Sequence, residues 1–436
     1  MRIRVGGGIE ARRALCGGMH AVAKGITLTA MLAFLIGCRT GTSEADGKVR
    51  LRFSGYAGNP AETDLMKALV DDFNRENPDV FVTYEPVPGQ YYPKLLTMLV
   101  SNTAPDVFYL DIIAFRPFLA KQKILRPLND LIAGSRALRR EDFVPELIDA
   151  FTDGQEVYGI PKDFNTLGLF YNKAMFTEAG VPVPDTNWDL DTLREVAKRL
   201  TTLTTTANGT KQHGFALTRD NADRYLPIAA SYGAKLFDDR GKCALASPEG
   251  VAAMEYYAGL KLVDHSAIYP AEVGSSWTGD AFGRRAAAMV FEGSWLIPYL
   301  RDSFPDVPYG VTELPMGPQG RSNFLFTVAY AIPQSSEHVD AAWRLIEFLT
   351  SEASQSRVTF ALPSRKSISA RYAERHPEYL PVLAGAAYAK PYEFGPKGTR
   401  VSERLGLAVQ EIFLGAKPPV RALRDACDEI DLLNTL

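Results

Sequence analysis

The feature that most constrains this fold is an alternation of strand and helix patterns between residues 49 and 111. Alternating apolar residues predict strands at 49–53 and 80–87, and a short buried strand follows at 106–110. Between them, apolar residues at helical spacing predict helices at 61–76 and 91–101. Strands joined through helices pair in parallel, so this order predicts an α/β fold with an open sheet flanked by helices.

The same order predicts where a ligand would bind. Open α/β sheets hold ligands outside the carboxyl ends of their strands. Tyr56 and Asn59 lie in the loop after the first predicted strand, and Asp111 follows the third. We therefore expect these residues near a binding cleft, although a turn would also suit Tyr56 and Asn59, and a helix cap would also suit Asp111.

Length and charge limit the function classes. A chain of 436 residues suits two or three domains. The formal net charge of −3 excludes a strongly basic nucleic-acid binder. The five His lie far apart, and no HExxH or CxxC motif occurs, so no metal site and no cofactor are expected.

The N-terminal segment has the pattern of an export signal. Five basic residues and one acidic residue in 1–24 precede an apolar run at 26–36 that is too short to span a membrane, which takes ~20 residues. Leu35-Ile36-Gly37-Cys38 resembles the lipobox of bacterial lipoproteins, which implies cleavage after residue 37 and a lipid on Cys38. Residues 38–48 have the composition of a flexible tether. The length of the leader suggests Met19 as the biological start.

Removal of the leader and lipidation of Cys38 would leave two free cysteines, Cys243 and Cys427. An oxidising compartment would allow them to form a disulfide. Their distance cannot be deduced from the sequence, so their pairing stays open here.

A set of short segments, in a fixed order over nearly all of residues 49–436, resembles the extracellular solute-binding proteins of ABC importers, in the sugar-binding branch similar to maltose-binding protein. The segments are APDVFYLD at 104–111, YGIP at 158–161, LFYNK at 169–173, AGVP at 179–182, NWD at 187–189, AF at 281–282, AAAM at 286–289, EGSW at 292–295, YGV to LP at 309–315, AW to FLT at 342–350 and LPSRKS at 362–367.

The resemblance implies a two-lobed periplasmic-binding-protein fold of type II. Such a protein captures solute outside the cytoplasmic membrane, closes on it and delivers it to an ABC permease, without enzymatic activity. The N-terminal lobe would comprise 49–163 and 329–368, and the C-terminal lobe 164–328 and 369–436. We expect the chain to cross between lobes near 163–167, 326–331 and 367–373.

A carbohydrate is the solute that the resemblance favours, and its chemistry predicts the pocket. Sugars offer an apolar ring face for aromatic stacking and hydroxyls for charged or amide groups. By resemblance, Trp295 would stack on sugar. Each further candidate could instead have a structural role; these are Asp163, Asn165, Trp277, Glu292, Arg365 and Tyr392.

Three alternatives remain open from the sequence. The same fold could bind a glycerol phosphodiester, a polyamine or an acidic sugar. An exported carbohydrate-active enzyme would need two carboxylates across a bond, and Asp111, Asp163 and Glu292 could supply them. A receptor that feeds a sensor kinase would look the same as a transport protein. We expect a monomer, held to the membrane by its lipid alone, that binds no nucleic acid.

Overall fold

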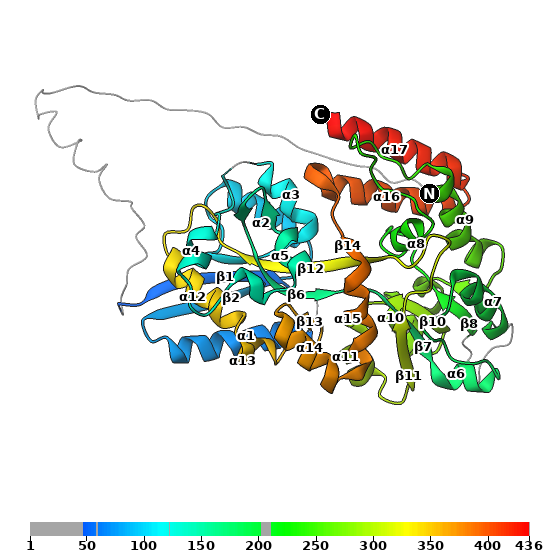
Figure 1. Ribbon diagram of the computed structural model, residues 1–436, viewed down its shortest axis with the longest axis horizontal. Coiled ribbons are helices and arrows are strands. Elements are labelled where there is room, and N and C mark those ends of the chain that lie inside the picture. Colours follow the sequence, from blue (N-terminus) through cyan, green and yellow to red (C-terminus); the bar gives the residue numbers. More distant parts are fainter. Residues whose placement is uncertain (1–46, 58–59, 122, 202–210, 436) are drawn as a thin grey trace, which may run out of the picture. The chain divides into compact units, whose positions relative to one another are not determined.

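The computed structural model describes residues 47–57, 60–121, 123–201 and 211–435. The predicted leader with Met19, the lipidation residue Cys38, most of the predicted tether and Asn59 lie outside these ranges. The described residues form two β-sheets flanked by helices, with the first sheet on the left and the second on the right of Figure 1. The predicted two-lobed α/β fold is confirmed.

The first sheet has seven strands in the order β13-β6-β12-β3-β1-β2, with β14 beside β12. Strand β1 runs parallel to both β2 and β3, while β12 runs antiparallel to β3 and β6. The strands are β1 (Val49–Tyr56), β2 (Val80–Val87), β3 (Val107–Asp111), β6 (Ile160–Asn165), β12 (Asn323–Ala331), β13 (Leu362–Pro363) and β14 (Ala389–Pro391).

Burial in β1 follows its alternation. Leu51 and Phe53 are buried, whereas Arg50 and Arg52 are exposed, as expected of a strand with one face on the core. The β1-helix-β2-helix-β3 order confirms the parallel unit predicted from residues 49–111. Because the strands are parallel, the loops after β1 and β3 lie at the same edge of the sheet.

The second sheet has five strands in the order β11-β7-β10-β8-β9. Its centre, β10 (Ala287–Glu292), is buried along its whole length. The other strands are β7 (Gly168–Asn172), β8 (His213–Ala216), β9 (Ala267–Ile268) and β11 (Tyr309–Glu313). A separate two-stranded ribbon pairs β4 (Thr152–Asp153) with β5 (Glu156–Val157).

Helices flank both sheets. Those of the chain up to β6 are α1 (Pro60–Glu76), α2 (Tyr91–Val100), α3 (Ile112–Leu119), α4 (Asn129–Gly134) and α5 (Pro145–Ala150). Those between β7 and β11 are α6 (Lys173–Glu178), α7 (Leu190–Leu200), α8 (Tyr225–Ser231), α9 (Pro248–Leu262), α10 (Thr278–Gly283) and α11 (Leu296–Ser303). Those after β12 are α12 (Val339–Leu349), α13 (Glu352–Gln355), α14 (Lys366–Arg375), α15 (Leu380–Gly385), α16 (Gly398–Phe413) and α17 (Pro419–Thr435).

The chain passes from the first sheet to the second between β6 and β7, through Thr166 and Leu167. The buried Asn323, at the start of β12, braces this passage: its Oδ1 accepts from Leu167 N at 3.0 Å and its Nδ2 donates to Leu167 O at 2.7 Å. One amide side chain thus ties two strands that lead between the sheets. The predicted lobe boundaries stay a prediction. Strands β6 and β12 pair from Asn165 and Phe326 onward into the first sheet.

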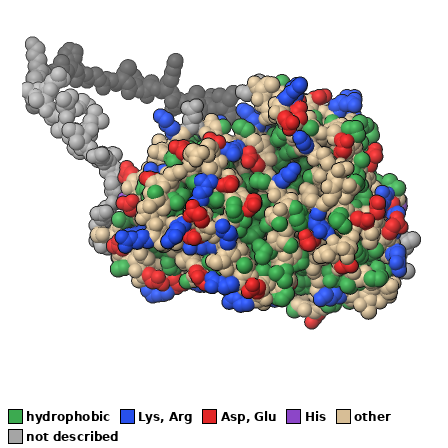
Figure 2. Space-filling model, viewed as in Figure 1, with side chains coloured by type: hydrophobic (Ala, Val, Ile, Leu, Met, Phe, Trp, Pro, Cys, Tyr) green, Lys and Arg blue, Asp and Glu red, His purple; other side chains and the backbone are tan. Residues whose placement is uncertain are grey.

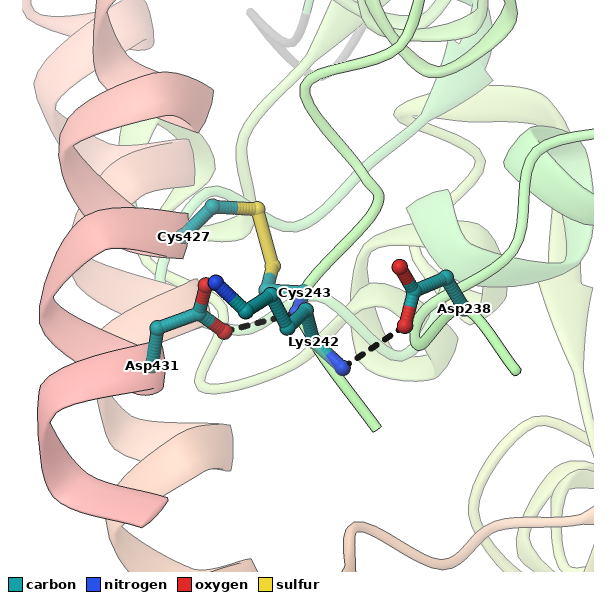
Figure 3. The surroundings of a disulfide bond; sticks show 5 residues. All are labelled: Asp238, Lys242, Cys243, Cys427 and Asp431. Atoms are coloured by element: carbon teal, nitrogen blue, oxygen red, sulfur yellow. Dashed lines mark hydrogen bonds between the residues drawn. A yellow bond between two sulfur atoms is a disulfide. The ribbon is translucent and has the colours of Figure 1, made fainter. Parts of the chain in front are cut away.

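The last two helices pack against each other at the upper right of Figure 1. Helix α16 packs against α3 and α9, and α17 packs against α16 and α9. A disulfide joins Cys427 on α17 to Cys243 in the loop between α8 and α9, with 5.0 Å between the Cα atoms (Figure 3). Beside it, Cys243 N donates to Asp431 Oδ1 at 2.8 Å. The pairing that the sequence left open therefore exists.

Charges of both signs are interspersed over the face shown in Figure 2. This mixture of charges on that face fits the small formal net charge of the chain. Among the described residues, none of the helices combines the length and the apolar character that a membrane span requires.

The disulfide predicts redox-dependent stability. A cross-link over 184 residues restricts the unfolded chain, so the double variant Cys243→Ser/Cys427→Ser should lose about 2–4 kcal/mol of unfolding free energy. Urea unfolding with and without reductant measures this loss. The reduced native protein should match the double variant, and equal stability of the oxidised protein and the variant would contradict the prediction.

Candidate functional site

A cavity of about 590 Å³ lies between the start of α1 and the helices α10 and α11. Its lining residues come from α1, from α11 and from the positions just before α10 and α11: Pro60, Ala61, Trp277, Trp295, Pro298, Tyr299, Asp302 and Ser303. Trp277 and Tyr299 meet edge to face, with ring centroids 4.9 Å apart. The volume and the aromatic lining are those of a small-molecule site.

Trp295 is held firmly in the wall of this cavity. Its indole Nε1 donates to Glu292 Oε2 at 2.7 Å. Its ring meets Phe326 of β12 edge to face at 6.0 Å, and the Arg224 guanidinium carbon lies 5.8 Å from the ring centroid. The predicted stacking residue therefore lines the cavity, and its ring orientation is set by contacts to both sheets.

Glu292 connects the polar side chains of that wall. It is 1% exposed at the end of β10, and Arg224 Nη2 donates to its Oε2 at 2.7 Å while the Thr278 hydroxyl donates to its Oε1. Arg224 also donates from Nε to Phe291 O at 2.7 Å and pairs with Asp223 Oδ2 at 2.9 Å. Burial lowers the pKa of the Arg224 guanidinium, but Asp223 and Glu292 outweigh this, so the net shift is upward and Arg224 is charged.

A second buried cation lies in the first lobe. Lys162 on β6 pairs with Glu62 Oε1 at 2.9 Å and with the Asp163 carboxylate, and all three side chains are buried. Its Nζ also lies 5.0 Å from the Tyr109 ring centroid. Burial alone would lower the pKa of Lys162, but Asp163 and Glu62 raise it overall. Asp163, which the sequence predicts as a site residue, thus forms an internal ion pair with Lys162.

Asp111 and Tyr56 lie at the shared edge of the first sheet, as predicted. Asp111 caps α3, where its Oδ1 accepts from Ile113 N at 2.8 Å. Burial raises the pKa of its carboxyl to about 6. Tyr56 packs edge to face against Tyr91 and Tyr109, with centroids 6.0 and 5.3 Å apart.

Asn165 joins the two sheets beside the cleft. Its Oδ1 accepts from Ser294 N at 3.0 Å and from the Ser294 hydroxyl, and both residues are buried. This bond anchors the segment that carries Trp295 to the last residue of β6. The side-chain oxygen of Asn165 thus has a structural role, and contact of Asn165 with solute stays a prediction.

Tyr392 and Arg365 lie outside the cavity lining. Tyr392 is 7% exposed, and its ring centroid lies 4.9 Å from that of Phe326, which in turn meets the Trp295 ring. Arg365 donates from Nη2 to Ala137 O at 2.9 Å and lies 3.6 Å from Asp142 Oδ2. The structure therefore does not bring Arg365 together with the other predicted site residues.

Sequence reasoning missed Tyr299, Asp223 and Arg224. Tyr299 lies inside a helix, where an aromatic residue at helical spacing suggests core. Arg224 follows an acidic residue in a loop before α8, and nothing in the sequence marks it. Only the burial of Glu292, which requires a positive partner nearby, could have indicated a residue such as Arg224.

The pKa of Asp111 predicts a pH dependence. The usual pKa of an Asp carboxyl is 3.8, so between about pH 4 and pH 6 the folded state keeps a proton that the unfolded state has lost. The free energy of unfolding therefore falls as the pH rises through this range. Asp111→Asn should not show this fall in stability. Urea unfolding of both proteins across this range should show the difference, and a carboxyl ¹³C titration should place the midpoint near 6. A midpoint near the usual value would contradict it.

Comparison with known proteins agrees with this architecture. The family model described as bacterial extracellular solute-binding protein matches residues 57–356. Among curated relatives, a putative binding protein of Brucella abortus is 24% identical and covers 90% of this chain and 94% of its own. An uncharacterized lipoprotein of Streptomyces antibioticus is 26% identical, with coverage of 74% and 71%. The arabinooligosaccharide-binding protein of Bacillus subtilis is 24% identical, with coverage of 74% and 74%.

Solved structures share the fold. An ABC substrate-binding protein of Listeria monocytogenes in complex with cycloalternan superposes with a TM-score of 0.81 at 21% identity, covering 89% of this chain and all of that one. UgpB of Mycobacterium tuberculosis in complex with glycerophosphocholine gives a TM-score of 0.75 at 19% identity, with coverage of 89% and 99%. The family match over most of the chain, together with the two-lobed fold, shows that this chain belongs to the bacterial extracellular solute-binding proteins.

Proposed function

We propose that this protein captures a carbohydrate in the cleft between its lobes and delivers it to an ABC permease. The observation that carries the proposal is the 590 Å³ cavity with Trp277, Trp295 and Tyr299 in its wall. Aromatic faces are the surfaces on which sugar rings stack. Two similar proteins, which bind arabinooligosaccharide and cycloalternan by their names, support the assignment.

The cavity walls also support a closing motion. Pro60 and Ala61 belong to α1 beside the first sheet, whereas Trp277 and Trp295 precede α10 and α11, and Tyr299 lies in α11. A solute that contacts both walls binds the closed arrangement more tightly than the open one, so it shifts the population toward closure. The closed monomer is then the form that docks on the permease subunits.

We propose binding without chemistry. Hydrolysis of a glycosidic bond needs one carboxyl that donates a proton and a second carboxylate opposite it. Glu292 is engaged by Arg224, Trp295 and Thr278, and Asp163 by Lys162. Asp111, the third carboxylate that the sequence offers, accepts from Ile113 N at the start of α3. The proposal therefore assigns none of the three to proton transfer.

The proposal includes a lipid anchor on Cys38, which would hold the protein at the outer face of a bacterial membrane. The lipobox-like LIGC sequence supports it, as does the lipoprotein among the curated relatives. Two or three acyl chains on one cysteine suffice for stable anchoring.

Loss of Trp295 tests the binding site. Trp295→Ala should weaken saccharide binding at least about 30-fold, because a buried aromatic anchor carries a large share of binding energy. Isothermal titration calorimetry against di- and trisaccharides measures it, after a thermal-shift screen has found those that bind. Trp188→Phe is the matched control, since Trp188 packs against Phe176 away from the cavity lining. Unchanged affinity of Trp295→Ala would refute the site.

Membrane attachment depends on Cys38 in this proposal. Cys38→Ser should move the expressed protein from the membrane fraction to the soluble fraction, because no acceptor for the lipid remains. Palmitate labelling and fractionation measure the change, with Cys243→Ser as a control that keeps the label. Retention of the label by Cys38→Ser would show that the anchor is elsewhere.

A further inference from the structure

The cavity follows one face of helix α11. Four of its lining residues lie at positions i, i+3, i+4 and i+7, which share a face of a helix: Trp295, Pro298, Tyr299 and Asp302. At the rise of an α-helix, the distance along the axis from Trp295 to Asp302 is about 10 Å. This wall is therefore longer than a single sugar ring.

Aromatic rings line this wall in two separate pairs. The first aromatic pair is Trp295 with Phe326 of β12, whose ring centroids lie 6.0 Å apart. One turn along α11, Tyr299 forms the second aromatic pair with Trp277, at 4.9 Å. Among the described residues, no ring contact joins Trp277 to Trp295. The wall thus offers two surfaces on which a sugar ring can stack.

The place of the Trp277 ring depends on a glycine. Gly279 lies in the first turn of α10, and a Cβ built on it would be 2.3 Å from both Cη2 and Cζ3 of Trp277. The same Cβ would be 2.8 Å from Cδ1 of the buried Leu296. Because the φ of Gly279 is not positive, the close approach of the indole, and not the backbone conformation, requires glycine here.

The Tyr299 ring is held by the next residue, Asp280, which lies outside the cavity lining. The Tyr299 hydroxyl donates to Asp280 Oδ1 at 2.9 Å, and Asp280 is 5% exposed. Arg284 Nε donates to Asp280 Oδ2 at 2.8 Å, but the Arg284 side chain is 51% exposed. Exposed ion pairs contribute little, so the bond to Tyr299 is the contact through which Asp280 acts on the cavity.

We propose that Gly279 and Asp280 are positioning residues, and that the second aromatic pair they hold makes the cleft prefer saccharides of two or more rings over monosaccharides. This inference rests on the proposed function and adds the size of the sugar. One ring stacks on Trp295, and the next ring of the same saccharide lies against Trp277 and Tyr299. Gly279 gives the indole its place, and Asp280 fixes the phenol ring from behind.

The experiment measures how affinity depends on the number of rings. After the thermal-shift screen, isothermal titration calorimetry compares the monosaccharide, disaccharide and trisaccharide of α-1,4-linked glucose, β-1,4-linked galactose and α-1,5-linked arabinose. In the series that binds most tightly, we expect the disaccharide and trisaccharide to bind about tenfold or more tightly than the monosaccharide, because a second ring gains its own aromatic contact.

Variants locate this preference. In Gly279→Ala and in Asp280→Leu, the ratio of monosaccharide to disaccharide dissociation constants should fall to within about twofold, with little change for the monosaccharide, because Trp295 remains. A merely structural role would weaken the binding of all sugars by the same factor and leave the ratio unchanged. Asp280→Asn should restore the ratio that Asp280→Leu loses, because an amide oxygen still accepts from the Tyr299 hydroxyl.

A third variant and two controls complete the set. Tyr299→Phe removes the hydroxyl that donates to Asp280, so it should lower the ratio even if Asp280→Leu fails to fold. Arg284→Gln removes the exposed partner of Asp280 and should keep the ratio. Gly134→Ala in α4 should also keep it, since a Cβ there meets no atom within 4 Å.

The outcomes separate the two proposals. Equal binding of monosaccharide and disaccharide, or an unchanged ratio in Gly279→Ala, Asp280→Leu and Tyr299→Phe, would overturn the inference about size and leave the carbohydrate function standing. Loss of the ratio in Arg284→Gln would overturn the role given to the bond between Asp280 and Tyr299. Binding of no saccharide in the thermal-shift screen would overturn the carbohydrate function itself.

Discussion

The wall of the second lobe depends on one buried carboxylate. Glu292, at the end of the central strand β10, accepts from the indole of Trp295, the guanidinium of Arg224 and the hydroxyl of Thr278. These partners come from three segments of the chain, and each would leave a polar group unsatisfied if the carboxylate were absent. The orientation of the aromatic ring in the cavity is therefore a consequence of charge neutralisation in the core.

Residues at strand ends also hold neighbouring segments in the first lobe. Asp111 caps α3 through one oxygen and still lies at the sheet edge where ligands bind, while Asn165 ends β6 and holds the segment before Trp295. Residues at strand ends can make structural contacts and still lie at the edge where open α/β sheets bind ligands. The alternatives that the sequence left open, cap or ligand contact, are thus compatible at Asp111.

The first lobe was predictable because its signals are local. Alternation in β1 and helical spacing in α1 each lie within a few residues, and their order dictates parallel pairing. The strand β10 was not predicted, because an Ala-rich run buried on both faces has neither alternation nor β-branched residues at its start. Trp277 and Trp295 were found through resemblance and chemistry. The Arg224–Glu292 and Lys162–Glu62 ion pairs depend on which distant carboxylates the fold brings together, and no local pattern encodes that.

The disulfide has a consequence for the order in which the molecule matures. Cys243 precedes its partner by 184 residues, so it stays a thiol while β9, β10, β11 and the returning strand β12 are synthesised. The cross-link can form only after Cys427, in the final helix α17, has been synthesised. If cleavage and lipidation take Cys16 and Cys38 as proposed, Cys243 and Cys427 have no other cysteine of the chain to pair with, so only one intramolecular pairing exists.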